Sequence, residues 1–148
     1  MADVVEKLHQ AAAAGDVDGV RSALAAGVDV NSRREFGDAA LNLAAENGHE
    51  SVVLTLVGAG ANIENLGGAD KTPIMSAAFA GHISIVRMLL AAGAHVSDDL
   101  LSGLSMKVNI LEENAELGMV SPEAAQAWRG FLESIIVERQ RQDRGEKR

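Results

Sequence analysis

Histidine, serine and aspartate are the side chains of this 148-residue chain that could carry out catalytic or metal chemistry. The four histidines are His9, His49, His82 and His95, and with serine and aspartate they could in principle supply a hydrolase triad. However, the sequence contains no Gly-x-Ser-x-Gly elbow and no phosphate-binding loop. The glycine-rich stretch 66–69 lacks the lysine and hydroxyl residue that would have to follow it. These patterns predict that the chain is not an enzyme and binds no cofactor.

The composition restricts the sites and partners that are expected. The chain has no cysteine, which excludes disulfides, thiolate nucleophiles and zinc–thiolate sites. Its formal net charge of −8 disfavours binding to nucleic acid, because such binding requires positive charge to displace counterions from the phosphates. The segment 138–148 differs from the rest of the chain because it is net positive, with five Lys or Arg and three Asp or Glu. We therefore expect no nucleic-acid partner.

No targeting or membrane-spanning segment is evident. The first residues contain no basic region followed by an apolar run, and no apolar stretch approaches the roughly 20 residues needed to span a bilayer. A soluble, cytoplasmic protein without membrane contact is the expectation. Hydrophobic residues make up 47% of the chain and aromatic residues only 3%, so the apolar content is mainly Ala, Val, Leu and Ile. This composition suits thin layers of closely packed helices.

Two series of glycines repeat at intervals of 33 residues. The series are Gly15, Gly48 and Gly81, and Gly27, Gly60 and Gly93. Glycine commonly ends a helix because it adopts the left-handed conformation without a Cβ clash. Glycines 12 residues apart therefore bracket one helix of about ten residues, which is too short to be stable alone in water. Such helices must pack in pairs, and each pair must bury its remaining apolar face against the next pair.

Each interval predicts the same order of elements. The first helices are expected to begin near Leu8, Leu41 and Ile74. Asp3 is expected to cap the first of these helices. Turn-rich segments at 32–38 and 65–71 are expected to form extended, hairpin-like loops. The predicted repeats are about 3–33, 34–66 and 67–97.

These residues resemble the ankyrin repeat family, whose pattern includes Thr-Pro-Leu-His, Ala-Ala, Gly-His, Val-Val, Leu-Leu and Gly-Ala-Asp-Val-Asn. The third interval matches best, with Thr72-Pro73-Ile74-Met75, Ala77-Ala78, Gly81-His82, Ile85-Val86, Leu89-Leu90 and Gly93-Ala94. The position of the usual histidine holds Asn42 in the second interval and Met75 in the third, so other contacts are expected to hold the turn there. The resemblance covers about residues 3–97 and implies an all-α ankyrin-repeat solenoid.

The repeat pattern ends after Gly93. Two amphipathic segments follow at about 98–117 and 122–140, and they predict an antiparallel helix pair that closes the open end of the stack. The polar end from 138 onward is expected to fray. In outline, we expect one domain over 1–148, with a helical cap at about 98–142 and a frayed tail at 143–148.

The resemblance assigns a structural role to two of the histidines. His49 and His82 occupy the family's Gly-His position, where the ring helps to hold the turn between helices. Equivalent positions in adjacent repeats lie on the order of 10 Å apart, which is too far for the two rings to share one ion. We therefore expect no metal site.

The resemblance also implies where a partner protein binds. In similar proteins the partner lies on the concave side, which consists of loop tips and the exposed face of each first helix. The corresponding tip positions are Arg33, Arg34, Glu35, Phe36, Asp38, Gly68, Ala69 and Lys71. The corresponding first-helix positions are Glu46, Asn47, Phe79 and Ala80. Phe36 and Phe79 stand out because aromatic residues are enriched among interface anchors, although each could instead fold back onto a neighbouring loop or helix.

The 33-residue period places Glu112 at the position of Glu46 and Phe79, if the register continues that far. Glu112 and Glu113 would then extend an acidic surface, which favours a partner with a basic surface. The predicted function is non-catalytic protein–protein binding, as an adaptor or as an inhibitor.

Two alternatives to this function remain open. The first is a self-associating structural protein, a homodimer formed through a stripe on the last helix. This stripe consists of Trp128, Phe131, Leu132, Ile135 and Ile136, which would equally serve to pack the cap. The second alternative is an enzyme on a repeat scaffold, which is disfavoured because no catalytic spacing emerges.

Overall fold

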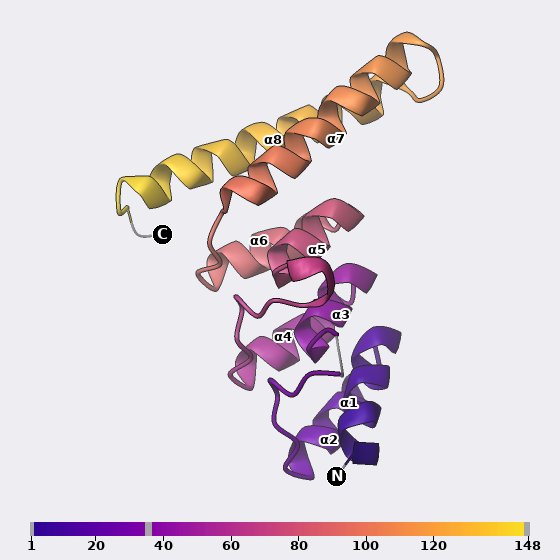
Figure 1. Ribbon diagram of the computed structural model, residues 1–148, viewed down its shortest axis with the longest axis vertical. Coiled ribbons are helices and arrows are strands. Elements are labelled where there is room, and N and C mark those ends of the chain that lie inside the picture. The colour runs from indigo at the N-terminus through magenta and orange to yellow at the C-terminus, as the bar shows by residue number, and fades with distance from the viewer. Residues whose placement is uncertain (1, 35–36, 147–148) are drawn as a thin grey trace. The chain divides into compact units, whose positions relative to one another are not determined.

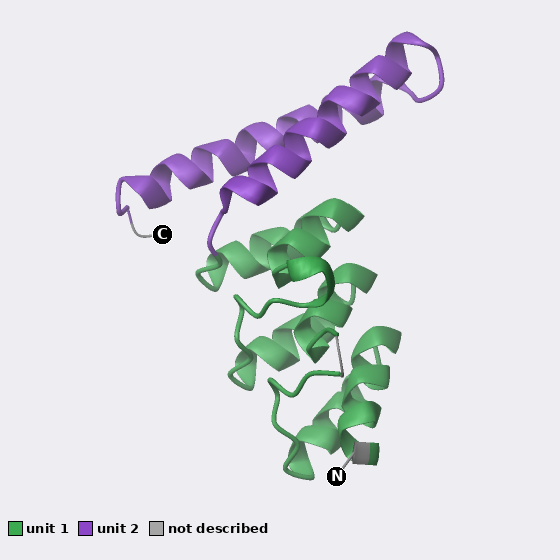
Figure 2. Ribbon diagram, viewed as in Figure 1, with its two compact units in different colours: residues 1–94 green, residues 95–148 purple. Residues whose placement is uncertain are grey.

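A computed structural model describes residues 2–34 and 37–146 of the chain. These residues form two compact units, Met1–Ala94 and His95–Arg148 (Figure 2). No helix in the described part of the chain is long and apolar enough to cross a membrane.

The first unit consists of three helix pairs (Figure 1). The pairs are α1 (Ala2–Ala14) with α2 (Val17–Ala25), α3 (Ala40–Asn47) with α4 (Glu50–Gly58), and α5 (Pro73–Ala80) with α6 (Ile83–Ala91). The first helices pack in the order α1, α3, α5, and the second helices pack in the order α2, α4, α6. Each helix is therefore stabilised by its neighbours rather than by its own length.

Glycine ends the first helices as predicted. Gly48 and Gly81 follow α3 and α5 with φ angles of 80° and 88°, in the left-handed region. The expectation for Asp3 is wrong, because α1 begins at Ala2 and Asp3 lies within its first turn. A carboxylate there still interacts favourably with the positive end of the helix dipole.

The core of the first unit is built from small and branched apolar residues. The alanine pairs of α3 and α5 are completely buried, which lets the first helices approach closely. The second helices contribute fully buried branched side chains such as Val52 and Leu56. Burial of each side chain of this size contributes about 1.5–3 kcal/mol, so the repeats hold together mainly through their apolar contacts.

Two loops project between the pairs. In the first, Arg33 and Ala39 form an isolated antiparallel bridge, as expected for a hairpin-like loop. In the second, the Gly67 N–H donates to the Lys71 carbonyl at 2.8 Å and encloses a short 3-10 turn, η1 (Gly68–Asp70). Ala69 has a φ angle of 56°, and such left-handed geometry costs an alanine about 1–2 kcal/mol. The tip of this loop is therefore a strained segment that neighbouring contacts must hold.

The second unit is a pair of long helices, α7 (Asp98–Glu116) and α8 (Pro122–Asp143). The hydroxyls of Ser97 and Ser121 cap their first turns. The helices are antiparallel, because residues near the end of α8 contact residues near the start of α7. An example is the Arg139 guanidinium, which lies 3.2 Å from the Asp98 carboxylate.

The end of α8 is more ordered than the sequence suggested. The prediction of fraying from residue 138 is wrong, since Glu138 is buried and α8 continues to Asp143. The side chain of Gln142 accepts a hydrogen bond from the Val96 N–H at 2.9 Å, and Arg139 donates to the Val96 carbonyl. These contacts hold the last turns of the helix.

The apolar stripe of α8 is buried in part. Phe131 and Ile135 are buried, and the ring of Trp128 packs edge-on against Phe131 with centroids 5.8 Å apart. The Lys107 ammonium of α7 lies 4.0 Å from the centroid of the Trp128 ring. These contacts show that part of the stripe packs within the second unit, whereas Ile136 of the same stripe is 37% exposed.

Candidate partner-binding surface

The helices α1 and α3 each carry a buried polar side chain that anchors the loop following their repeat. The side chain of His9 is completely buried, and its ring nitrogens lie 2.8 Å from the Val5 carbonyl and 2.9 Å from the Ser32 carbonyl. Asn42 lies 33 residues further on and is also completely buried. Its amide donates to the carbonyl of Asn65, which is equivalent to Ser32, at 3.0 Å. Each loop is thereby fastened to the helix pair before it.

Asn42 also corrects one expectation. Its amide donates to the Lys71 carbonyl at 3.1 Å as well. Asn42 itself therefore holds the turn, for which other contacts were expected. Met75, which follows His9 and Asn42 at the same 33-residue spacing, has no strong hydrogen-bond donor. No loop of the same kind follows Met75, because α7 begins at Asp98, 33 residues after Asn65. The role of His9 was missed, although the spacing of 9, 42 and 75 was visible in the sequence.

His49 and His82 tie each repeat to the one before it. The Nε2 atoms lie 2.9 Å from the carbonyls of Ala13 and Glu46, which are themselves equivalent residues. The rings cover the glycines that end the preceding first helices. A Cβ atom on Gly48 would lie 2.7 Å from the His82 ring. The predicted structural role is therefore confirmed, but the bonds reach the preceding repeat. In the described part of the chain, no group of three His, Asp or Glu could hold a metal ion.

Asp38 links one loop to the next. Its Oδ1 atom accepts a hydrogen bond from the Gly68 N–H at 2.8 Å. The approach is so close that a Cβ atom on Gly67 would lie 2.1 Å from the same oxygen. Although Asp38 was a predicted binding residue, the structure uses its carboxylate to hold the strained second loop.

The arginines of the first loop are exposed. Arg33 donates to the Gly37 carbonyl at 3.2 Å, and Arg34 forms an ion pair with Glu6 of α1. The hydrogen bond from Arg34 holds the pKa of Glu6 below its ordinary value. These contacts thus hold both guanidinium groups at the surface. The predicted residues Glu35 and Phe36 lie outside the described residues.

The remaining predicted residues of the first unit lie on α3, α5 and the second loop. Glu46 and Asn47 are exposed at the end of α3, where the Asn47 amide donates to its own helix. Phe79, at the equivalent position of α5, is half-buried, and so is Lys71. Because α3 packs against α5, the structure brings Glu46 and Phe79 onto neighbouring helices.

Glu112 and Glu113 belong to the second unit, on α7. The repeat register does not reach them, because α7 occupies positions where a repeat would have its loop. The expected equivalence of Glu112 with Glu46 is therefore wrong. Glu112 instead accepts hydrogen bonds from Arg129 of α8, one of them at 2.5 Å, and Glu113 is exposed.

Replacing Arg129 with glutamine is expected to return the pKa of Glu112 to its ordinary value near 4.5, because hydrogen bonds from Arg129 hold that pKa lower. In the wild type the folded pKa lies below the unfolded one. The pair therefore stabilises the fold above the unfolded pKa, and this stabilisation is lost as the pH falls through the folded pKa. The effect on stability is small because both side chains are at the surface.

Carboxyl NMR titration of both proteins measures this change. Arg87→Gln is a suitable control, since Arg87 is exposed on α6 in the other unit. An unchanged pKa of Glu112 in Arg129→Gln would contradict the assigned ion pair.

Comparison with known protein families supports the reading of the repeats. Residues 8–99 match the family described as "Ankyrin repeats (3 copies)", which is more than half of the chain. No curated protein matches the chain. Proteins of this family are generally protein–protein interaction modules and are typically non-catalytic. The glycine spacing, the paired helices and the matched residues together show that this chain belongs to the ankyrin repeat family.

Proposed function

We propose that this chain is a non-catalytic adaptor or inhibitor that binds a partner protein through its first unit. The proposed concave surface consists of Arg33, Arg34, Glu46, Asn47, Lys71 and Phe79. It combines an exposed acidic group, cationic groups and one half-buried aromatic ring. This combination resembles the anchors and polar rims of protein interfaces.

The observation that carries this proposal is the set of polar side chains that fasten the loops. His9, Asn42 and Asp38 form hydrogen bonds to the loops, while Arg33, Arg34 and Glu46 are exposed. Loops that are already ordered lose little conformational entropy on binding. These hydrogen bonds therefore support a preorganised surface.

The partner that best fits this surface is a protein with a basic patch opposite Glu46. Glu46 is exposed at the end of α3, and its backbone carbonyl lies 2.9 Å from the His82 Nε2 atom. The net charge of −8 also favours encounter with a basic protein.

The Phe79→Ala and Glu46→Lys variants test the proposal. We expect each to weaken binding of the partner purified with the wild-type protein, by about tenfold or more for Phe79→Ala if it is an interface anchor. The melting temperature should change little, because neither side chain is fully buried. Isothermal titration calorimetry and thermal denaturation measure the two effects separately.

Leu54→Ala is the matched control for these variants. Leu54 is 61% exposed on α4, one of the second helices, and lies outside the concave surface. It should bind the partner like the wild type. Wild-type affinity in both Phe79→Ala and Glu46→Lys would contradict the proposed surface.

A further inference from the structure

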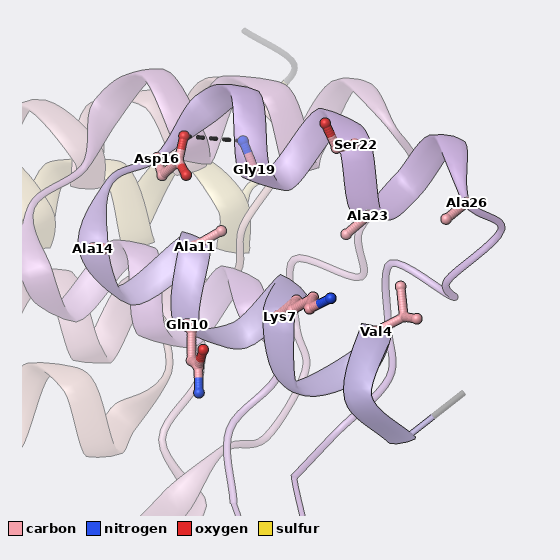
Figure 3. Close-up of a pocket in the computed structure, with 10 residues that line it drawn as sticks. All are labelled: Val4, Lys7, Gln10, Ala11, Ala14, Asp16, Gly19, Ser22, Ala23 and Ala26. Atoms are coloured by element: carbon pink, nitrogen blue, oxygen red, sulfur yellow. Dashed lines mark hydrogen bonds between the residues drawn. The ribbon is translucent and has the colours of Figure 1, made fainter.

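A groove of about 650 Å³ runs between α1 and α2 on the side of the first repeat away from the second (Figure 3). Small side chains line most of it, including Ala11, Gly19 and Ala23. Lys7 and Asp16 are its charged residues. The Asp16 carboxylate already accepts a hydrogen bond from the Gly19 N–H, at 2.9 Å. Lys7 is therefore the charged group that remains available to an incoming molecule.

The groove lies beside the small residue Ala23, which stands where the other repeats carry a larger side chain. Gly19 lies one turn before Ala23, but a Cβ atom on Gly19 would lie only 2.5 Å from the Asp16 carboxylate, so the space beside this glycine is occupied. The equivalent positions of the other repeats hold the buried residues Val52, Leu56, Ile85 and Leu89. The same face of the second and third repeats is covered by the helices of the repeat before it. The shape of the groove therefore suits a helix that brings its own large apolar side chains.

The second unit carries an exposed helix face of this kind. On α7, Met106 is 66% exposed and Ile110 is 47% exposed, and the two residues are one turn apart. Leu104 and Val108 are buried, so α7 has a separate exposed apolar side. Met106 and Ile110 therefore form a short apolar ridge on α7, and helices pack by seating such ridges in grooves.

Charge also favours this pairing. Glu113 follows Ile110 by three residues and lies on the same side of α7. It is exposed, and no ion pair of Glu113 is found in the described part of the chain. With the apolar ridge seated, one carboxylate of α7 would approach Lys7, the available cation of the groove.

We propose that the groove of one copy receives the exposed face of α7 from a second copy. Met106 and Ile110 fill the groove beside Ala23, and Glu113 pairs with Lys7. Two different surfaces meet, so the association is head-to-tail. A dimer formed in this way retains one free groove and one free α7 face, and longer assemblies grow as the concentration rises.

Sedimentation equilibrium of the full chain tests the proposal, at concentrations up to about 1 mM. The weight-average mass should rise above the monomer mass of 15.4 kDa without levelling at a dimer. A strictly monomeric protein would overturn the proposal, whether the groove stays empty, is filled within one chain or awaits a different protein. A closed dimer would overturn it as well.

Two exposed substitutions identify the surfaces. Ser22→Arg blocks the groove, and Ile110→Arg disrupts the α7 face. Each variant alone should lose self-association by about tenfold or more. An equimolar mixture should form a 1:1 complex that stops at two chains, because one intact groove and one intact face remain. Two variants that stay monomeric when mixed would overturn the proposal.

Charge reversal tests the predicted ion pair. Lys7→Glu and Glu113→Lys should each weaken self-association, and the double variant that carries both changes in one chain should recover it, because opposite charges then meet again at every contact. An exposed pair of this kind changes affinity by about fivefold. Arg21→Glu, on α2 but outside the groove, is the matched control, and circular dichroism verifies the fold of every variant. Failure of the double variant to recover self-association would refute the pairing. The concave surface would be unaffected, since Glu46 and Phe79 take no part in this contact.

Discussion

Replacing His9 with alanine is expected to lower the free energy of unfolding by about 3 kcal/mol. The side chain is completely buried, so its loss leaves a cavity within the first unit. The substitution also leaves the Ser32 carbonyl without the ring nitrogen that lies 2.9 Å from it. Urea denaturation followed by far-UV circular dichroism measures the change.

His9→Asn separates the hydrogen bond from the cavity. Asn42 shows that an asparagine at the equivalent position reaches the equivalent carbonyl, that of Asn65. His9→Asn should therefore destabilise the protein less than His9→Ala. Equal losses in the two variants would mean that the hydrogen bond to the loop contributes nothing. A loss well below about 1 kcal/mol in His9→Ala would contradict both the burial and the bond.

Replacing Gly48 with alanine is expected to destabilise the protein by about 3 kcal/mol, whereas Gly60→Ala should cost only about 1–2 kcal/mol. Both glycines have positive φ angles, of 80° and 88°, so an alanine at either position is strained by the left-handed conformation. Only at Gly48 does the new Cβ atom also meet a neighbour, 2.7 Å from the His82 ring. A Cβ atom on Gly60 would have no atom of the described residues within 4 Å, apart from its two neighbours in the chain. The difference between the two variants thus measures the contact between repeats.

A double-mutant cycle with His82→Ala tests the origin of this difference. Without the imidazole ring, the cost of Gly48→Ala should fall to that of Gly60→Ala, because only the backbone strain remains. Thermal or urea denaturation of the four proteins gives the coupling energy. An unchanged cost in the His82→Ala background would show that the ring does not cause the extra loss.

Sequence alone determined the helix pairs, because the features that end short helices are local. A left-handed turn requires glycine at one position, and Gly15, Gly48 and Gly81 mark those positions directly. The alanine pairs and branched residues between them specify which faces pack. The same reasoning located the long helices α7 and α8, but it misjudged where α8 ends. The contacts that hold its last turns come from residues 96 and 98, more than 40 positions earlier in the chain.

Only the tertiary structure decided what the polar side chains do. Asp38 is of a residue type that is usual at the surface, yet its carboxylate accepts a hydrogen bond from the Gly68 N–H of the next loop. Glu112 continues the 33-residue count, yet it lies on a different kind of helix and pairs with Arg129. Hydrogen bonds and ion pairs form between atoms within about 3 Å of each other, and that proximity arises from packing between distant segments. A periodic sequence therefore predicts where the backbone turns, while the fold decides which polar groups remain for a partner.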